Sequence, residues 1–206
     1  MVLAMSMFIN NYMILNNEEF TEKKLTDITK EIIQKYRNKY CNNANAKIFY
    51  NENKKWVCIY FSGVFNSLYT LDSLKKHVSL LASHYGTAVI HNQVIETNSL
   101  AMIMHDDCVS DAYIIDRGDF LLYDCPDGPI IQMNIDKWKR LLEYDKDVVK
   151  QILEAEYDDE SERLKALWVL LGFDEILVLC DDNSYDWLIN YKPDMIKAFN
   201  IIDVRL

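Results

Sequence analysis

The sequence predicts an α+β fold, in which a mixed or antiparallel sheet packs against helices and the C-terminal third is mainly helical. Three observations predict it: strand-like runs alternate with two amphipathic helix patterns before residue 96, a hairpin pattern follows, and helical spacing prevails from Ile135 onward. The chain has 206 residues, of which 50% are hydrophobic and 26% charged, the balance of a soluble globular protein. We therefore expect a single domain over residues 1–206, with the loop at 124–129 as the place for a subdomain boundary.

The first elements are predicted to be a strand and a long helix. Residues 7–15 are largely apolar and end at two asparagines, which indicates an edge strand followed by a helix cap. Residues 18–39 have acids in the first turn, bases near the end and one apolar stripe at helical spacing. The stripe consists of Leu25, Ile28, Ile32 and Tyr36.

A polar, turn-like stretch at 42–55 precedes a second strand and a second helix. Residues 56–61 form a β-branched and aromatic run that is apolar on both faces, which predicts a strand. Thr70 or Asp72 is placed to cap the helix that follows. Gly86 comes directly after the last turn of that helix, at a position that favours glycine.

A further strand and a hairpin complete the predicted sheet. Residues 87–95 form the strand, and residues 100–105 and 109–115 form the two arms of the hairpin. Asp106 and Asp107 lie between the arms, where aspartates favour a turn.

The rest of the chain is predicted to be mostly helical. Short helices are expected around Trp138, from Asp147, and over a segment that closes at Gly172. The run at 176–180 is too short for periodicity to distinguish a strand from a helix. The tail from Asp186 is apolar enough to pack back on the body.

Charge is distributed unevenly along the chain. Residues 1–100 contain 11 lysines and arginines and 8 acidic residues, a net charge of +3. Residues 101–206 contain 11 lysines and arginines and 24 acidic residues, a net charge of −13, and the two halves give the total of −10. A negative field repels phosphate backbones and speeds encounter with cationic proteins, so we expect a basic protein partner and no nucleic acid. Solubility alone is the alternative explanation of the charge.

The acidic residues are concentrated at residues 143–186, a segment that contains 14 acidic and 4 basic residues. We expect this segment to form a partner-binding surface, with two tyrosines as aromatic anchors among the carboxylates. The residues of this predicted acidic surface are Glu154, Glu156, Tyr157, Asp158, Asp159, Glu160, Glu162, Asp181, Asp182, Tyr185 and Asp186. A solvated junction between helices is the alternative interpretation of the same run.

A catalytic interpretation depends on the histidine beside the predicted hairpin turn. A histidine close to two carboxylates can divide acid and base roles with them, and a second histidine could complete the pocket. The catalytic candidates are therefore His91, His105, Asp106 and Asp107. Adjacent strand residues face opposite ways, however, and the sequence has no nucleophile elbow, phosphate-binding glycine loop or metal-binding spacing. We expect no cofactor and no metal.

The cysteines and the amino terminus predict the compartment. Five cysteines lie far apart and form no CxxC pair, which is typical of free thiols in a reducing cytoplasm. The amino terminus lacks the leading basic residues of a signal peptide, and no apolar stretch approaches the roughly 18 residues that span a bilayer. We expect a cytoplasmic protein that does not enter membranes.

A strand that begins at Trp56 is followed by a helix that ends at Gly86, a hairpin at Asp106 and a helix that ends before Gly172. This layout resembles the immunity proteins of bacterial polymorphic-toxin systems and uncharacterised bacterial domains of similar build. The resemblance covers residues 56–172 and is one of pattern. It implies a non-enzymatic protein that binds one toxin, often a nuclease, and blocks its site by charge and shape. Two other functions stay open: a small hydrolase with the histidine and aspartate pocket, and a regulatory subunit that oligomerises through an apolar patch.

Overall fold

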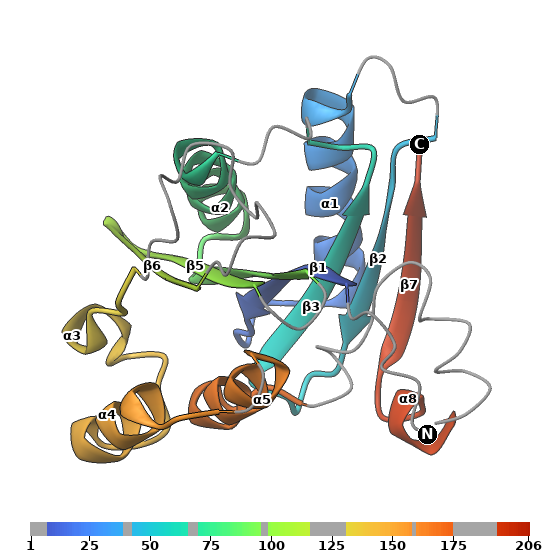
Figure 1. The fold of residues 1–206 in the computed structure, drawn as a ribbon. Helices are drawn as coiled ribbons and strands as arrows, with labels where there is room; N and C mark the ends of the chain where they lie inside the picture. The colour runs from blue at the N-terminus through green and yellow to red at the C-terminus, as the bar shows by residue number, and fades with distance from the viewer. Residues whose placement is uncertain are drawn as a thin grey trace, which may run out of the picture.

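The computed structural model describes residues 8–38, 43–65, 70–95, 99–115, 131–157, 160–174 and 193–206. The described strands form one seven-stranded antiparallel sheet in the order β6-β5-β4-β1-β3-β2-β7. They are β1 (Phe8–Leu15), β2 (Asn45–Tyr50), β3 (Trp56–Ser62), β4 (Val89–Ile95), β5 (Ser99–Asp106), β6 (Val109–Ile115) and β7 (Asn200–Arg205). A sheet of this kind packed against helices confirms the predicted α+β class (Figure 1).

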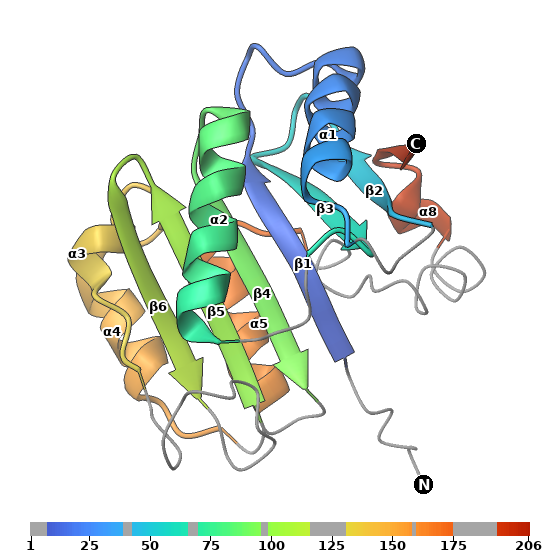
Figure 2. The ribbon, with the colours of Figure 1, turned by 90° about the horizontal axis from the view of Figure 1, so that it is seen from above.

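Helices cover both faces of the sheet, so the molecule has three layers (Figures 1 and 2). The helices α1 (Glu22–Tyr36) and α2 (Leu71–Tyr85) lie side by side on one face. The helices α3 (Ile135–Trp138), α4 (Lys146–Glu154) and α5 (Glu160–Leu171) lie on the other face. A short helix, α8 (Pro193–Ile196), precedes β7. Each helix layer buries its own apolar core against the sheet.

Local capping signals determine where the two long helices begin and end. The helix α1 begins at Glu22 because the Thr21 side chain accepts a hydrogen bond from a first-turn backbone N–H, so the helix starts later than predicted. The helix α2 is capped by Thr70, whose side chain and that of Ser73 accept hydrogen bonds from each other's backbone N–H groups. Gly86 ends α2 in the left-handed conformation, with φ +68°, as predicted.

The first strand lies at the centre of the sheet, and the prediction of an edge strand was wrong. The strand β1 pairs with β4 on one side and β3 on the other. Met13 and Ile14 point to opposite faces and are both fully buried, one in each core. A strand that is apolar on both faces is suited to a covered, central position.

Two strands were not predicted, and one of them changes the description of the C-terminal third. The strand β2 lies within the stretch expected to be a turn, and β7 is the last segment of the chain. They pair with each other, with Ile48 opposite Ile202. The C-terminal third is therefore not mainly helical, because it ends in an edge strand of the sheet.

The predicted hairpin and the later helices are present. The strands β5 and β6 pair around a turn at Asp107, which has φ +52°. The helix α4 is capped by Asp145, and α5 closes at Gly172 with φ +69°. The predicted loop at 124–129 and the run at 176–180 lie outside the described residues. Across the described ranges, no helix has the length and apolar character needed to cross a bilayer.

Candidate functional site

The catalytic candidates at the β5–β6 hairpin lie on opposite faces of the sheet. His105 faces α2, where its Nδ1 lies 2.7 Å from Ser110 Oγ and its Nε2 lies 3.5 Å from Ser79 Oγ. Asp106 faces the other helix layer, and its carboxylate accepts two hydrogen bonds from the guanidinium of Arg140, one of them 2.7 Å long. The alternation of strand side chains thus separates the histidine from the aspartate. Asp107 is exposed at the turn.

The aspartates of the hairpin hold the α3 segment to the sheet. Asp106 binds Arg140, and the Asp111 carboxylate accepts hydrogen bonds from the Asn134 backbone N–H (2.7 Å) and from Trp138 Nε1 (2.8 Å). Trp138 is fully buried beneath this connection. The carboxylates therefore have structural partners that the sequence pattern did not reveal.

His91 is a buried, neutral residue of the sheet. Its Nε2 lies 2.9 Å from Asn10 Oδ1, and its ring lies 4.7 Å from the ring of Tyr12. Burial, with a smaller contribution from nearby His77, lowers the pKa of His91 to about 3. The structure therefore does not assemble His91, His105 and the aspartates into one catalytic group. Within the ranges given above, no group of three or more histidine, cysteine, aspartate or glutamate residues is arranged to hold a metal ion.

A buried row of amides crosses β1 and β4, and the sequence analysis did not predict it. Asn11 lies opposite Asn92 in the register, and Asn92 Nδ2 donates to Asn11 Oδ1 at 3.1 Å. Asn11 Nδ2 in turn donates to the Tyr60 hydroxyl at 3.2 Å. A one-residue slip of β1 against β4 would break these bonds, so the row fixes the strand register. Polar residues at the middle of two apolar strands were the available signal.

Four side chains of the predicted acidic surface are described, and they lie at the junction of α4 and α5. Glu154 ends α4 and Glu162 lies in the first turns of α5; both are exposed, as is Glu156 between the helices. The Glu154 carboxylate lies 3.8 Å from Lys150 Nζ, one turn earlier. The side chains of the remaining predicted residues lie outside the described part: Asp158, Asp159, Glu160, Asp181, Asp182, Tyr185 and Asp186.

Tyr157 is partly buried and has partners within the fold, and its expected role as an aromatic anchor stays a prediction. Its hydroxyl donates to the Ile152 carbonyl at 3.1 Å, and its ring centroid lies 4.7 Å from the Arg163 guanidinium carbon. Burial raises the pKa of Tyr157, and the arginine opposes this shift. Arg163 also donates to the Leu153 carbonyl at 3.1 Å. The tyrosine thus closes the α4–α5 junction.

The end of α4 carries acids where a helix favours bases. The C-terminus of a helix has partial negative charge, which cations stabilise and carboxylates oppose. The last turn of α4 has no basic residue and ends in Glu154, which is 67% exposed and followed by Glu156. The arrangement lowers helix stability, and such local conflicts are found at functional sites. Glu162, by contrast, lies near the N-terminus of α5, where a carboxylate is favourable.

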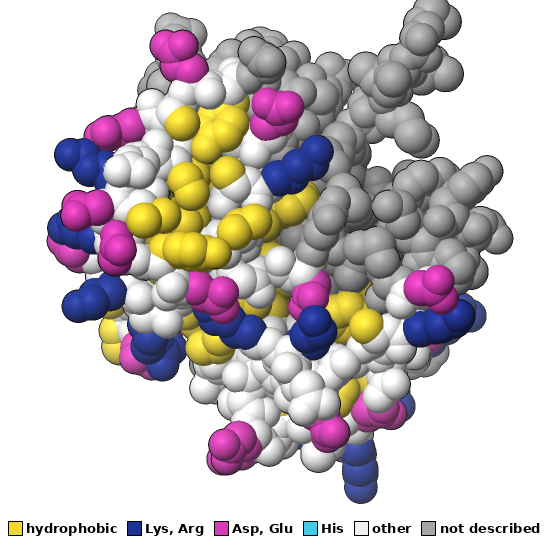
Figure 3. Space-filling view, turned by 90° about the horizontal axis from the view of Figure 1, so that it is seen from below, with side chains coloured by type: hydrophobic (Ala, Val, Ile, Leu, Met, Phe, Trp, Pro, Cys, Tyr) yellow, Lys and Arg dark blue, Asp and Glu magenta, His cyan; other side chains and the backbone are white. Residues whose placement is uncertain are grey.

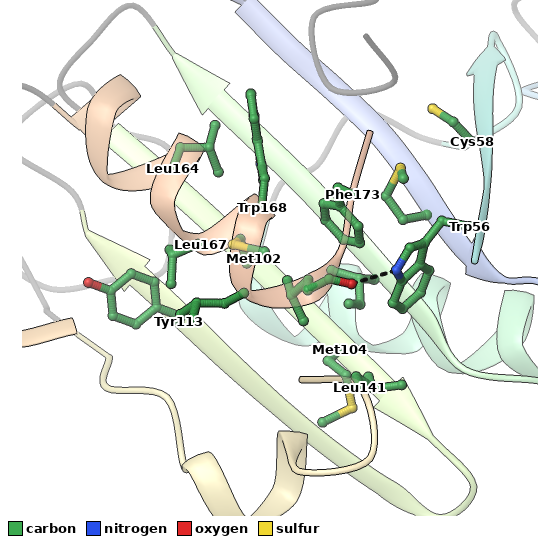
Figure 4. Close-up of a cluster of buried hydrophobic side chains, with 14 of the residues drawn as sticks. Trp56, Cys58, Met102, Met104, Tyr113, Leu141, Leu164, Leu167, Trp168 and Phe173 are labelled. Atoms are coloured by element: carbon green, nitrogen blue, oxygen red, sulfur yellow. Dashed lines mark hydrogen bonds between the residues drawn. The ribbon is translucent and has the colours of Figure 1, made fainter. Parts of the chain in front are cut away.

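An apolar strip, with acidic and basic side chains around it, lies on the face of the molecule seen in Figure 3. Leu164, Leu167 and Trp168 of α5 are buried in the core under the sheet (Figure 4). Val169 lies on the outer side of the same helix and is 56% exposed. Partly exposed apolar side chains accompany it on both helices: Val148, Ile152, Leu153 and Ala166. We call these residues, together with Glu154, Glu156 and Glu162, the α4–α5 face.

No family model matches the chain, and neither a curated protein nor a solved structure matches it.

Proposed function

We propose that this protein is a non-enzymatic binding module whose α4–α5 face docks a cationic protein. The observation that carries the proposal is the exposure of Val169, an apolar side chain in the last turn of a helix whose other large apolar residues are buried. Partly exposed aliphatic side chains of α4 and α5 are included with this site, and Glu154 at the end of α4 and Glu156 after it supply the acids of the face. Interfaces commonly combine an apolar centre with a charged rim.

The apolar strip and the acids have different effects on binding. Burying the exposed part of one valine contributes about 1 kcal/mol, so the strip supplies affinity and slows dissociation. The carboxylates attract a basic partner over roughly 8 to 10 Å at physiological ionic strength, so they speed association. A partner with a basic rim around an apolar patch fits both features.

The most specific form of the proposal is an immunity protein that neutralises a toxin. A net charge of −13 in the second half of the chain complements a basic nuclease, whose surface must attract phosphates. The layout of residues 56–172 resembles proteins of this kind. Steric and electrostatic occlusion of the toxin's site would then be the mechanism, and it needs no catalytic residue.

The immunity-protein form requires that a toxin with a basic domain is encoded beside this chain in its genome, and the absence of such a gene would contradict it. The basic domain of that toxin is the partner in the binding test. Association and dissociation rates are measured by surface-immobilised binding at low and physiological salt. Replacing Glu154, Glu156 and Glu162 by lysine should reduce the association rate about tenfold at low salt. V169S should raise the dissociation rate roughly fivefold, which corresponds to about 1 kcal/mol.

A matched control and two outcomes make the test decisive. Val109 on β6 is 40% exposed and lies outside the α4–α5 face, so V109S should leave both rates unchanged. The proposal would be contradicted if the association and dissociation rates were the same in the wild type and in every variant of the α4–α5 face. If the protein dimerises in sedimentation and V169S makes it monomeric, the face joins two copies of this chain instead, and the proposed partner is wrong.

A further inference from the structure

A groove of about 690 Å³ lies between the end of α1 and the outer surface of α2. Figure 2 shows the two helices side by side above the sheet, on the side opposite α4 and α5. The groove is lined by Lys35, Tyr36, Asp72, Lys75, Lys76, Ser79, Leu80, Ser83 and His84. The groove is shallow and open to solvent, so a small molecule would lie along it with one side exposed.

The groove is positively charged, although the whole chain has a net charge of −10. Lys35, Lys75 and Lys76 line it, and Asp72 is the single acid among the lining residues. Neither Lys75 nor Lys76 forms an ion pair with a residue in the described ranges. Two ammonium groups without carboxylate partners on one helix face favour an anion.

The other lining side chains offer hydroxyl groups and a partly apolar wall. Ser79 and Ser83 lie on the same side of α2 as the lysines, and hydroxyl groups donate hydrogen bonds to phosphate oxygens. Tyr36 and His84 contact edge to face, with ring centroids 5.8 Å apart, and Leu80 is half-buried. A ring system can lie against such a wall while its charged group contacts the lysines.

We propose that this groove binds a small phosphorylated molecule that carries a ring, such as a nucleotide. Lys75, Lys76 and Ser83 would contact the phosphate, and Leu80 and the edge of Tyr36 would contact the ring. Lys35 Nζ already lies 5.1 Å from the centroid of the Tyr36 ring, and Ser79 Oγ lies 3.5 Å from His105 Nε2. A long polyanion such as RNA is disfavoured because most of its phosphates would lie beyond the lysines that line the groove. This site is independent of the α4–α5 face, so the two proposals can fail separately.

The experiment is calorimetric titration of the purified chain with ADP, with inorganic pyrophosphate and with a short single-stranded RNA. ADP should bind with a Kd below about 1 mM. The double variant K75Q/K76Q should weaken binding by about tenfold, because each lysine contributes one charge-assisted contact. The control K146Q/K150Q removes two lysines from α4 and should leave the Kd unchanged.

Three results would overturn the inference. Absence of ADP binding would remove the site, and pyrophosphate that binds as tightly as ADP would show that no ring is recognised. RNA that binds more tightly than ADP, with loss on K75Q/K76Q, would assign the groove to nucleic acid instead. The expected result is ADP binding that the α2 variant weakens and the α4 variant does not change.

Discussion

Burial of His91 in its neutral form should make folding stability depend on pH. The ordinary histidine pKa is 6.5, and burial lowers that of His91 to about 3. Between these two values, the unfolded chain binds a proton at this position and the folded chain does not. The contribution of His91 to the free energy of unfolding is therefore fully present above pH 6.5 and decreases as the pH is lowered toward 3.

The size of the effect follows from the shift in pKa. Each pH unit below 6.5 costs a little over 1 kcal/mol, so this histidine alone should lower the free energy of unfolding by about 3 kcal/mol at pH 4.5. Replacing His91 with glutamine removes the titrating group, and the amide can still donate to Asn10 Oδ1. Between pH 7 and pH 4.5, the free energy of unfolding of H91Q should therefore decrease by about 3 kcal/mol less than that of the wild type.

The assay is urea unfolding followed by tryptophan fluorescence, which reports on the three fully buried tryptophans Trp56, Trp138 and Trp168. Carboxylates also titrate over this range, but they are the same in both proteins, so the difference between the two pH-dependent losses isolates the histidine. The pKa of His77 is also lowered by burial, and H77Q serves as a second comparison with a smaller expected effect. If H91Q loses as much stability as the wild type, His91 is not held neutral by burial.

Two further predictions concern stability at neutral pH. D106A should lower the free energy of unfolding by about 1 kcal/mol, a modest value because the partner Arg140 is half-exposed. D107A at the exposed turn should change the free energy of unfolding by less than about 0.5 kcal/mol. Urea unfolding measures both effects. G172A and G86A should each lower the free energy of unfolding by about 1 kcal/mol, because both glycines have left-handed φ values, a Cβ at Gly86 meets open space, and a Cβ at Gly172 meets only the flexible end of the Glu143 side chain, which can move aside. A much larger loss of thermal stability in G172A than in G86A would contradict that reasoning.

Elements with strong local signals could be predicted from the sequence. Gly86 and Gly172 closed their helices as expected, and the aspartates between 100–105 and 109–115 indicated the hairpin correctly. Thr70 rather than Asp72 is the cap, because its side chain and that of Ser73 bond reciprocally. Such features depend on residues a few positions apart, and local sequence contains that information.

The strands β2 and β7 could not be predicted because each depends on the other. Ile48 and Ile202 are partners across the sheet but lie far apart in the chain. Around β2, the polar residues Asn45 and Lys47 alternate with buried Ala46 and Ile48, and the asparagines before it obscured this pattern. A short edge strand gains its stability from a partner strand, which periodicity in one segment cannot identify.

The candidate site was predicted in part, for a similar reason. Exposed Glu154, Glu156 and Glu162 follow from charge alone, but the burial of Tyr157 depends on the position of Arg163. The exposure of Val169 was equally hidden, since α5 is apolar on most of its surface and periodicity could not separate its faces.

The layering of the fold places helices from the two halves of the chain on opposite faces of the sheet. The helices α1 and α2 come from the basic half of the sequence and cover one side of the sheet, whereas α4 and α5 come from the acidic half and cover the other. Lys75 and Lys76 of α2 therefore lie across the sheet from Glu154 of α4. The proposed groove on α2 and the proposed docking site on the α4–α5 face are thus separated by the sheet, so a variant in one of them can be tested without disturbing the other.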